Sequence, residues 1–198
     1  MKTLVFGYSS GIGKAIYDTC KEKGFEITGI GLDESVNIDN HEDRKQVVLA
    51  SKDYDVIYVV PNGVTTNFSQ CVMLTELFGA YQYEYKKIVI IGGSSPSTRN
   101  KDVKNLNKHL YDANNKALEF LSDKFNFLND PCQVILIRPG RLDSGHNIGS
   151  SKAMIDPYKL ADNIIKLVQM SKEMRIISTT IIQDSHTGTN GKLSGENE

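Results

Sequence analysis

Six short runs rich in valine, isoleucine and leucine recur along the chain, and the segments between them have helical spacing. The runs lie at residues 3–6, 25–31, 54–60, 87–93, 133–139 and 175–182. Most lack a clean alternation of apolar and polar residues, which indicates strands covered on both faces. Such strands, separated by helices, predict an α/β fold: a doubly wound parallel sheet of about seven strands flanked by helices, in a single domain.

The segment after the first run has the pattern of an amphipathic helix that ends at Gly24. Six residues fall on one face of this helix: Ile12, Ala15, Ile16, Thr19, Cys20 and Lys23. At the other end of the chain, residues 185–198 are polar and rich in glycine, with nothing to bury. We therefore expect a folded domain over residues 1–184 and a mobile tail over 185–198.

Three glycines stand between the first run and this helix, in GYSSGIG at residues 7–13. Gly7, Gly11 and Gly13 leave room for a tight turn, for a pyrophosphate near main-chain N–H groups, and for close packing of the helix. The N-terminus of the helix adds a favourable field for an anion. This pattern predicts a dinucleotide-binding loop, and a purely structural turn is the alternative.

The composition argues against several other classes of protein. The 23 Lys and Arg residues are balanced by 24 Asp and Glu residues, so no net positive charge attracts nucleic acid or anionic membranes. No run approaches the roughly 20 apolar residues of a membrane span, and no cleavable apolar segment opens the chain. Cys20, Cys71 and Cys132 are widely spaced, as reduced core thiols are, and the four histidines lack metal-ligand spacing. We expect a cytoplasmic protein without a metal, nucleic-acid or membrane partner.

The loop SSGIG at residues 9–13 resembles the glycine loop of the short-chain dehydrogenase/reductase family, whose Rossmann-like domain binds NAD or NADP. The spacing G-x-x-x-G-x-G is the one found in that family. The resemblance implies cofactor contacts for Gly7, Ser9, Ser10, Gly11, Ile12 and Gly13.

Later segments resemble the same family in the same order. Three of the family's strands with their following turns are similar to YDVIYVVPNG, IVIIGGSS and VILIRPGRLDSG. Its closing helix and closing strand are similar to MIDPYKLADNIIKLV and RIISTTIIQDS. In the family, a serine after the second of these strands orients the substrate, which here implies Ser94 or Ser95. Further cofactor contacts are implied for Asn62, Gly63, Pro139 and Gly140.

The family transfers a hydride between NAD(P) and a carbonyl or alcohol. In its usual mechanism a tyrosine hydroxyl is the general acid or base, and a lysine four residues later lowers the pKa of the tyrosine and holds the ribose. An unperturbed tyrosine has a pKa near ~10, so a nearby cation favours its phenolate at neutral pH. The resemblance implies an NAD(P)-dependent oxidoreductase for a small carbonyl or alcohol substrate, with Tyr111 and Lys116 as this pair.

The spacing of this pair departs from the family, because Tyr111 and Lys116 are five residues apart. At about 100° per residue, side chains five positions apart lie roughly 140° apart around a regular helix. In such a helix Asn115 takes the lysine position. We expect the buried stripe of this helix to consist of Leu110, Ala113, Ala117 and Leu121. Tyr111 and Lys116 then lie on opposite flanks of the stripe.

Three interpretations of this site stay open. A one-residue π-bulge would bring Tyr111 and Lys116 together, and such bulges favour functional sites. Alternatively, Asn115 replaces the lysine, with Lys108 as a substitute cation and with weak or altered activity. In the third interpretation the protein is a catalytically silent dinucleotide-binding or partner-binding module.

The choice between NAD and NADP depends on the end of the second run. An acidic residue about 20 positions beyond the glycines binds the adenosine ribose and favours NAD. Gly31 stands at that position, and Asp33, two residues further, favours NAD slightly unless it is a solvated loop carboxylate. Asn37 stands where the family often has an aspartate near the adenine. It is either a cofactor contact or a structural residue.

The stretch from Gly63 to Ile88 is shorter than the corresponding stretch usually is in the family, which argues against a family-like tetramer and leaves a homodimer plausible.

Overall fold

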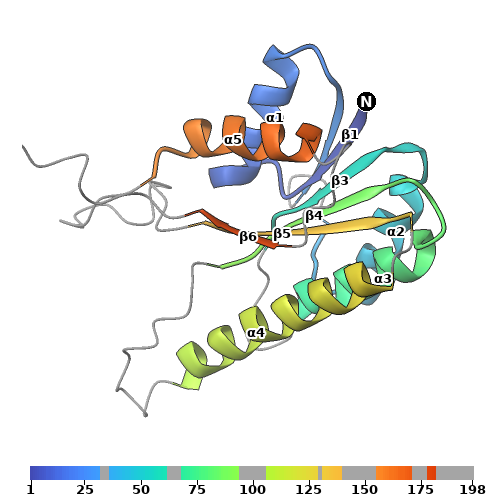
Figure 1. Cartoon of the computed structure of the whole chain (residues 1–198), viewed down its shortest axis with the longest axis vertical. Helices are drawn as coiled ribbons and strands as arrows, with labels where there is room; N and C mark the ends of the chain where they lie inside the picture. The colour runs from blue at the N-terminus through green and yellow to red at the C-terminus, as the bar shows by residue number, and fades with distance from the viewer. Residues whose placement is uncertain are drawn as a thin grey trace, which may run out of the picture.

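The computed structural model describes residues 1–31, 36–61, 68–93, 106–128, 131–139, 155–170 and 178–181. Strands and helices alternate along these residues (Figure 1). The strands are β1 (Lys2–Phe6), β2 (Glu26–Ile30), β3 (Val56–Val59), β4 (Lys87–Ile91), β5 (Gln133–Pro139) and β6 (Ser178–Ile181). The helices are α1 (Gly11–Glu22), α2 (His41–Ala50), α3 (Ser69–Tyr81), α4 (Leu106–Phe127) and α5 (Pro157–Met170).

All six described strands form one parallel sheet in the order β2-β1-β3-β4-β5-β6. This confirms the doubly wound α/β fold, although the described residues contain six strands where we expected about seven. Because β1 lies between β2 and β3, the winding reverses at β1. The carboxyl ends of all the strands share one edge of the sheet, and ligands of such folds bind at this edge, beside the reversal point.

Helices cover both faces of the sheet (Figure 1). Helices α1 and α5 lie on one face, and α2, α3 and α4 lie on the other. Along β1, Val5 belongs to the core under α1 and α5, whereas its neighbour Leu4 belongs to the core under α3 and α4. Both side chains are fully buried, which explains why the strands lack a polar face.

Helix α1 buries the face that the sequence predicts. Ile12, Ala15, Ile16, Thr19 and Cys20 are buried. Lys23, at the end of the predicted face, lies instead at the surface, where its Nζ is 2.8 Å from Asp162 Oδ1 of α5.

The cysteines meet a further expectation, and two other expectations stay predictions. All three cysteines are free and buried, as expected of core thiols. Among the described helices none is long and apolar enough to cross a bilayer. The expected tail 185–198 lies outside the described residues, and the domain limits 1–184 stay a prediction.

A buried lysine just before β4 binds the main chain of the segment that precedes β3. Lys86 is 6% exposed, and its Nζ donates to the main-chain oxygens of Lys52 and, at 2.8 Å, of Tyr54. These carbonyls lie at the end of a short 3-10 helix, Ser51–Asp53, that follows α2. The ammonium also lies 4.8 Å from the ring centroid of Tyr81. One cation thus satisfies carbonyls that have no partner within their own helix.

We predict that Lys86→Met lowers the free energy of unfolding by about 1–3 kcal/mol, because buried carbonyls lose a charged donor while the packing volume is kept. Urea unfolding at pH 7 measures this change. The control is Lys45→Met on the exposed side of α2, which should change stability by less than about 0.5 kcal/mol. Equal stability of the two variants would contradict the prediction.

Candidate active site

The glycine loop connects the carboxyl end of β1 to α1. Gly7 has φ +90°, in the left-handed region, and donates its N–H to the oxygen of Ile30 at 2.7 Å, which ties the loop to β2. A Cβ atom on Gly13 would lie 1.9 Å from the main-chain oxygen of Gly7. Only glycine therefore allows α1 to begin so close to the loop. The tight turn and the close helix packing expected from the sequence are both present.

The residues just before α1 face solvent at the same edge. Ser9 and Ser10 are exposed, and Ser10 is the N-cap residue in an extended conformation. Among the described residues its side chain makes no capping hydrogen bond. The side chain of Ile12 is buried, so this residue offers a ligand only its main chain. Unpaired N–H groups and the helix dipole make such a turn suitable for an anion, and the cofactor contacts of these residues stay predictions.

Tyr8 packs beside this loop against β2, a contact that the sequence analysis did not identify. A Cβ atom on Gly29 would lie 2.4 Å from Tyr8 Cγ, so the ring depends on that glycine. At Gly31 a Cβ atom would meet Tyr8 and Ser9 only at 3.6 and 3.8 Å, which is ordinary contact. Contact at Cβ therefore does not exclude a side chain at this position, where the family has its acidic residue and this chain has glycine.

Asn37 has a structural role in the turn before α2. Its side-chain Oδ1 accepts the N–H of Asp39 at 3.0 Å, and its own N–H donates to Asp43 Oδ2 at 2.8 Å. These bonds form the compact turns typical of asparagine. Its contact with a cofactor stays a prediction.

Two side chains of α4 reach the carboxyl end of β4. A Cβ atom on Gly93 would lie 1.7 Å from the hydroxyl oxygen of Tyr111, so this hydroxyl lies directly against Gly93. One turn later, Asn115 is 2% exposed, and its Oδ1 accepts the N–H of Gly93 at 2.9 Å. Tyr111 and Asn115 therefore converge on one residue, at the sheet edge where the glycine loop begins.

The structure corrects the prediction that Lys116 pairs with Tyr111. Helix α4 is a continuous α-helix from Leu106 to Phe127, without the π-bulge of the first interpretation. The side chain of Lys116 is 66% exposed, and its Nζ lies 2.8 Å from Glu119 Oε2. The fifth residue after Tyr111 points away from it, because a regular helix rotates it by roughly 140°.

Glu119 holds Lys116 on that outer side. Its Oε2 also lies 3.2 Å from Arg138 Nη1 of β5, so one carboxylate joins two cations. The hydrogen bond from Lys116, together with the charge of Arg138, lowers the pKa of Glu119 below its ordinary value. The carboxylate is therefore charged at neutral pH, and the outward position of Lys116 is stabilised.

The buried face of α4 differs from the predicted apolar stripe, since Ala113 is exposed. The buried residues of this helix are Asn114, Asn115, Leu118, Ser122 and Asn126. Asn126 shows why polar residues occupy that face: its side chain bonds both the N–H and the oxygen of Val134, at 3.0 and 2.6 Å. Helix α4 is thus attached to the neighbouring strands by hydrogen bonds as well as by apolar contact.

Of the other predicted site residues, Pro139 is described, as the buried last residue of β5. Lys108 lies within the first turn of α4. Six predicted residues lie outside the described part of the chain: Asp33, Asn62, Gly63, Ser94, Ser95 and Gly140.

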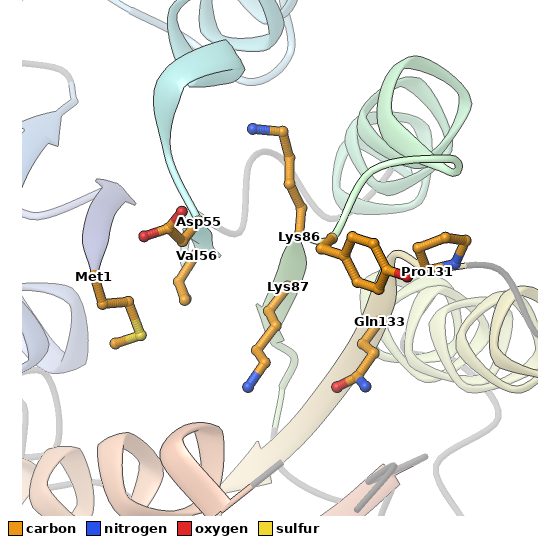
Figure 2. A pocket seen from close by; sticks show the side chains of 8 residues that line it. Met1, Asp55, Val56, Lys86, Lys87, Pro131 and Gln133 are labelled. Atoms are coloured by element: carbon orange, nitrogen blue, oxygen red, sulfur yellow. The ribbon is translucent and has the colours of Figure 1, made fainter. Parts of the chain in front are cut away.

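A separate pocket of about 330 Å³ lies at the opposite edge of the sheet (Figure 2). Asp55, Lys87 and Gln133, at the starts of β3, β4 and β5, contribute to its lining. Because the strands are parallel, these starts lie at the edge away from the glycine loop. This pocket is therefore not part of the site at the carboxyl ends.

Solved structures with the same fold cover nearly the whole chain, whereas no family model and no curated protein sequence matches it. The 3-alpha-hydroxysteroid dehydrogenase from Pseudomonas sp. B-0831, complexed with NADH, has a TM-score of 0.73 and 14% identity over 93% of this chain and 96% of that one. BdcA in complex with NADPH has a TM-score of 0.68 and 16% identity over 95% and 98%. A short-chain dehydrogenase/reductase from Vibrio parahaemolyticus has a TM-score of 0.68 and 14% identity over 92% and 99%. The chain has the fold of the short-chain dehydrogenases/reductases.

We predict that Glu119→Gln removes a pH-dependent part of the stability. Because the folded-state pKa of Glu119 is lowered, its ionised form stabilises the protein at neutral pH, and this contribution is lost as the pH falls through that pKa. Urea unfolding between pH 7 and pH 3 measures the effect. The parent should be the more stable protein at pH 7, and the difference should shrink below pH ~4.5, the ordinary glutamate range. A difference that is constant with pH would contradict the prediction.

Proposed function

We propose that this protein binds NAD or NADP at the carboxyl ends of β1, β3 and β4 and transfers a hydride between the cofactor and a small carbonyl or alcohol. One observation carries the proposal: the Tyr111 hydroxyl lies against Gly93, at the edge where the glycine loop begins. The similar structures with NADH and NADPH support this cofactor class. Asp33 stays the reason to favour NAD slightly.

Each part of the chain has a distinct task in this proposal. The glycine loop and the first turn of α1 bind the pyrophosphate through main-chain N–H groups. In the reductive direction Tyr111 donates its hydroxyl proton to the carbonyl oxygen, and in the oxidative direction it accepts the alcohol proton. Ser94 or Ser95 orients the substrate. The nicotinamide, when bound, supplies or accepts the hydride.

Asn115 takes the place of the family lysine in this site. It lies one turn after Tyr111, and its Oδ1 is used by Gly93. Its Nδ2 has no hydrogen-bond partner among the described residues and remains as a neutral donor. A neutral amide cannot stabilise a phenolate as an ammonium does, so we expect slower turnover than the family mechanism allows.

A second candidate function follows from the same replacement. Lys116 is bound to Glu119 on the outer side of α4, away from Tyr111. A site that retains the glycine loop without this cation also fits a silent dinucleotide-binding or partner-binding module. Binding of a dinucleotide without turnover would distinguish this module from the enzyme.

The dinucleotide site is tested by placing a negative charge at Ser10. Aspartate is a favoured N-cap residue, so Ser10→Asp should keep or raise the stability of α1 while repelling the pyrophosphate. We predict that calorimetric titration with NAD+, NADH, NADP+ and NADPH finds binding by the parent and at least about tenfold weaker binding by Ser10→Asp, a change of ~1.4 kcal/mol. The control Ser10→Asn, an equally good neutral cap, should bind like the parent. A folded parent that binds none of the four dinucleotides would overturn both the oxidoreductase and the silent dinucleotide-binding module.

Catalysis is tested by removing one oxygen atom from Tyr111. With the cofactor that binds and a panel of small aldehydes and ketones, Tyr111→Phe should lower kcat/KM by at least ~100-fold, the usual contribution of a general acid. The affinity for the cofactor should stay within about twofold, since less than ~0.5 kcal/mol is at stake. Lys116→Met and the exposed control Tyr83→Phe should retain the activity of the parent. Equal activity of Tyr111→Phe and the parent would exclude the assigned role.

A further inference from the structure

The end of β3 leaves the edge of β4 without its main-chain partner. The register sets Val59 opposite Ile90, and continuing it by two residues would set Pro61 opposite Gly92. Gly92 itself donates to β5, so the groups on either side of it in β4 face β3. In a parallel pair, residue 61 would donate its N–H to the oxygen of Ile91. Proline has no N–H, so β3 cannot form this bond.

Two buried side-chain amides take the place of the missing strand. Gln70, in the first turn of α3, donates its Nε2 hydrogen to the oxygen of Ile91 at 3.1 Å. Asn115 of α4 accepts the N–H of Gly93 at 2.9 Å. The two side chains are 1% and 2% exposed. Together they satisfy the two main-chain groups of β4 that a further residue of β3 would otherwise pair.

The first turn of α3 is attached to three different parts of the fold. Ser69 donates to Asp39, in the turn before α2, Gln70 binds β4, and Cys71 donates to Asn114 of α4. The preceding residue, Phe68, has φ +52°, a left-handed conformation that is unfavourable for a bulky side chain. Strain of this kind persists where the surrounding contacts require it, and it concentrates at functional sites.

Each amide also has one buried polar atom that no described residue pairs. Oε1 of Gln70 and Nδ2 of Asn115 have no hydrogen bond among the described residues. Such orphaned atoms are rare because they oppose folding. An apolar side chain at either position would avoid this cost but would leave β4 unpaired. The two amides are therefore retained for the bonds that they make to the strand end.

We propose that Gln70 is a positioning residue of the candidate active site. It fixes Ile91, and through the end of β4 it sets where Gly93 meets the Tyr111 hydroxyl and Asn115. This inference rests on the proposed function, because the position that Gln70 controls is that of the proposed general acid, Tyr111.

Two substitutions of Gln70 separate positioning from packing. Gln70→Met keeps the volume and cannot donate to Ile91. Gln70→Glu can donate only as the protonated acid, so it restores the bond at low pH and loses it when the carboxyl ionises. Burial raises the pKa of such a carboxyl, which brings this change into the working range. The titratable groups around this turn, Asp39, Cys71 and Tyr111, are common to all the proteins compared.

The experiment measures NADH and NADPH affinity by calorimetry between pH 5.5 and pH 8.5 on the full chain. Gln70→Met should bind about tenfold more weakly than the parent at every pH, a change of ~1.4 kcal/mol, because the strand end that Gln70 no longer fixes is in the binding-competent position only part of the time. Gln70→Glu should match the parent within about twofold at pH 5.5 and approach the affinity of Gln70→Met at pH 8.5. Gln46→Met and Gln46→Glu, on the exposed side of α2, are matched controls that should bind like the parent.

Amide hydrogen exchange of Gly93, measured without cofactor, is the second readout. Each variant is compared with the parent at the same pH. Gln70→Met should exchange faster than the parent at every pH, and Gln70→Glu should exchange faster only at high pH. Parent-like affinity of both Gln70 variants at all pH values, or unchanged Gly93 exchange, would overturn the inference. If the parent binds neither dinucleotide, the proposed function fails, and the Gly93 exchange alone decides whether Gln70 holds the end of β4.

Discussion

The end of a parallel strand has to find partners for its main-chain groups, and in this protein that requirement shapes the candidate site. Strand β3 stops two residues before Pro61, so the last groups of β4 need hydrogen bonds from elsewhere. Side chains of two helices, Gln70 of α3 and Asn115 of α4, supply them. The same bonds that complete the sheet therefore fix α3 and α4 relative to its carboxyl edge and place Tyr111 against Gly93.

The glycine loop lies at the same edge, at the carboxyl end of β1, where the winding reverses. Gly13 lets α1 begin against the main chain of Gly7, and the exposed Ser9 and Ser10 lie just before the start of this helix. In the proposed function, this edge of the sheet has an anion-binding end at the glycine loop and a hydroxyl end at Tyr111. Its neutral Asn115, in place of a cation, separates this site from the family mechanism and makes turnover the decisive question.

Local patterns in the sequence are enough to predict the buried strands and the glycine loop. Each of these features depends on residues that are neighbours in the chain. The five-residue spacing of Tyr111 and Lys116 also predicts their separation by helix geometry alone. The polar buried face of α4 is not readable in this way, because Asn115 and Asn126 are buried through bonds to distant strands. Gln70 is missed for the same reason, since its partner lies 21 residues further along the chain.

The central claim is that a dinucleotide binds at the carboxyl edge of the sheet, and NMR amide shifts on the full chain test it most directly. Titration with NADH or NADPH should shift the amides of Gly11, Gly13 and Gly93 most strongly, because they border the proposed pyrophosphate and hydroxyl ends of the site. Shifts confined to Lys87 and Gln133, at the pocket on the opposite edge, or no shifts at all, would contradict the claim.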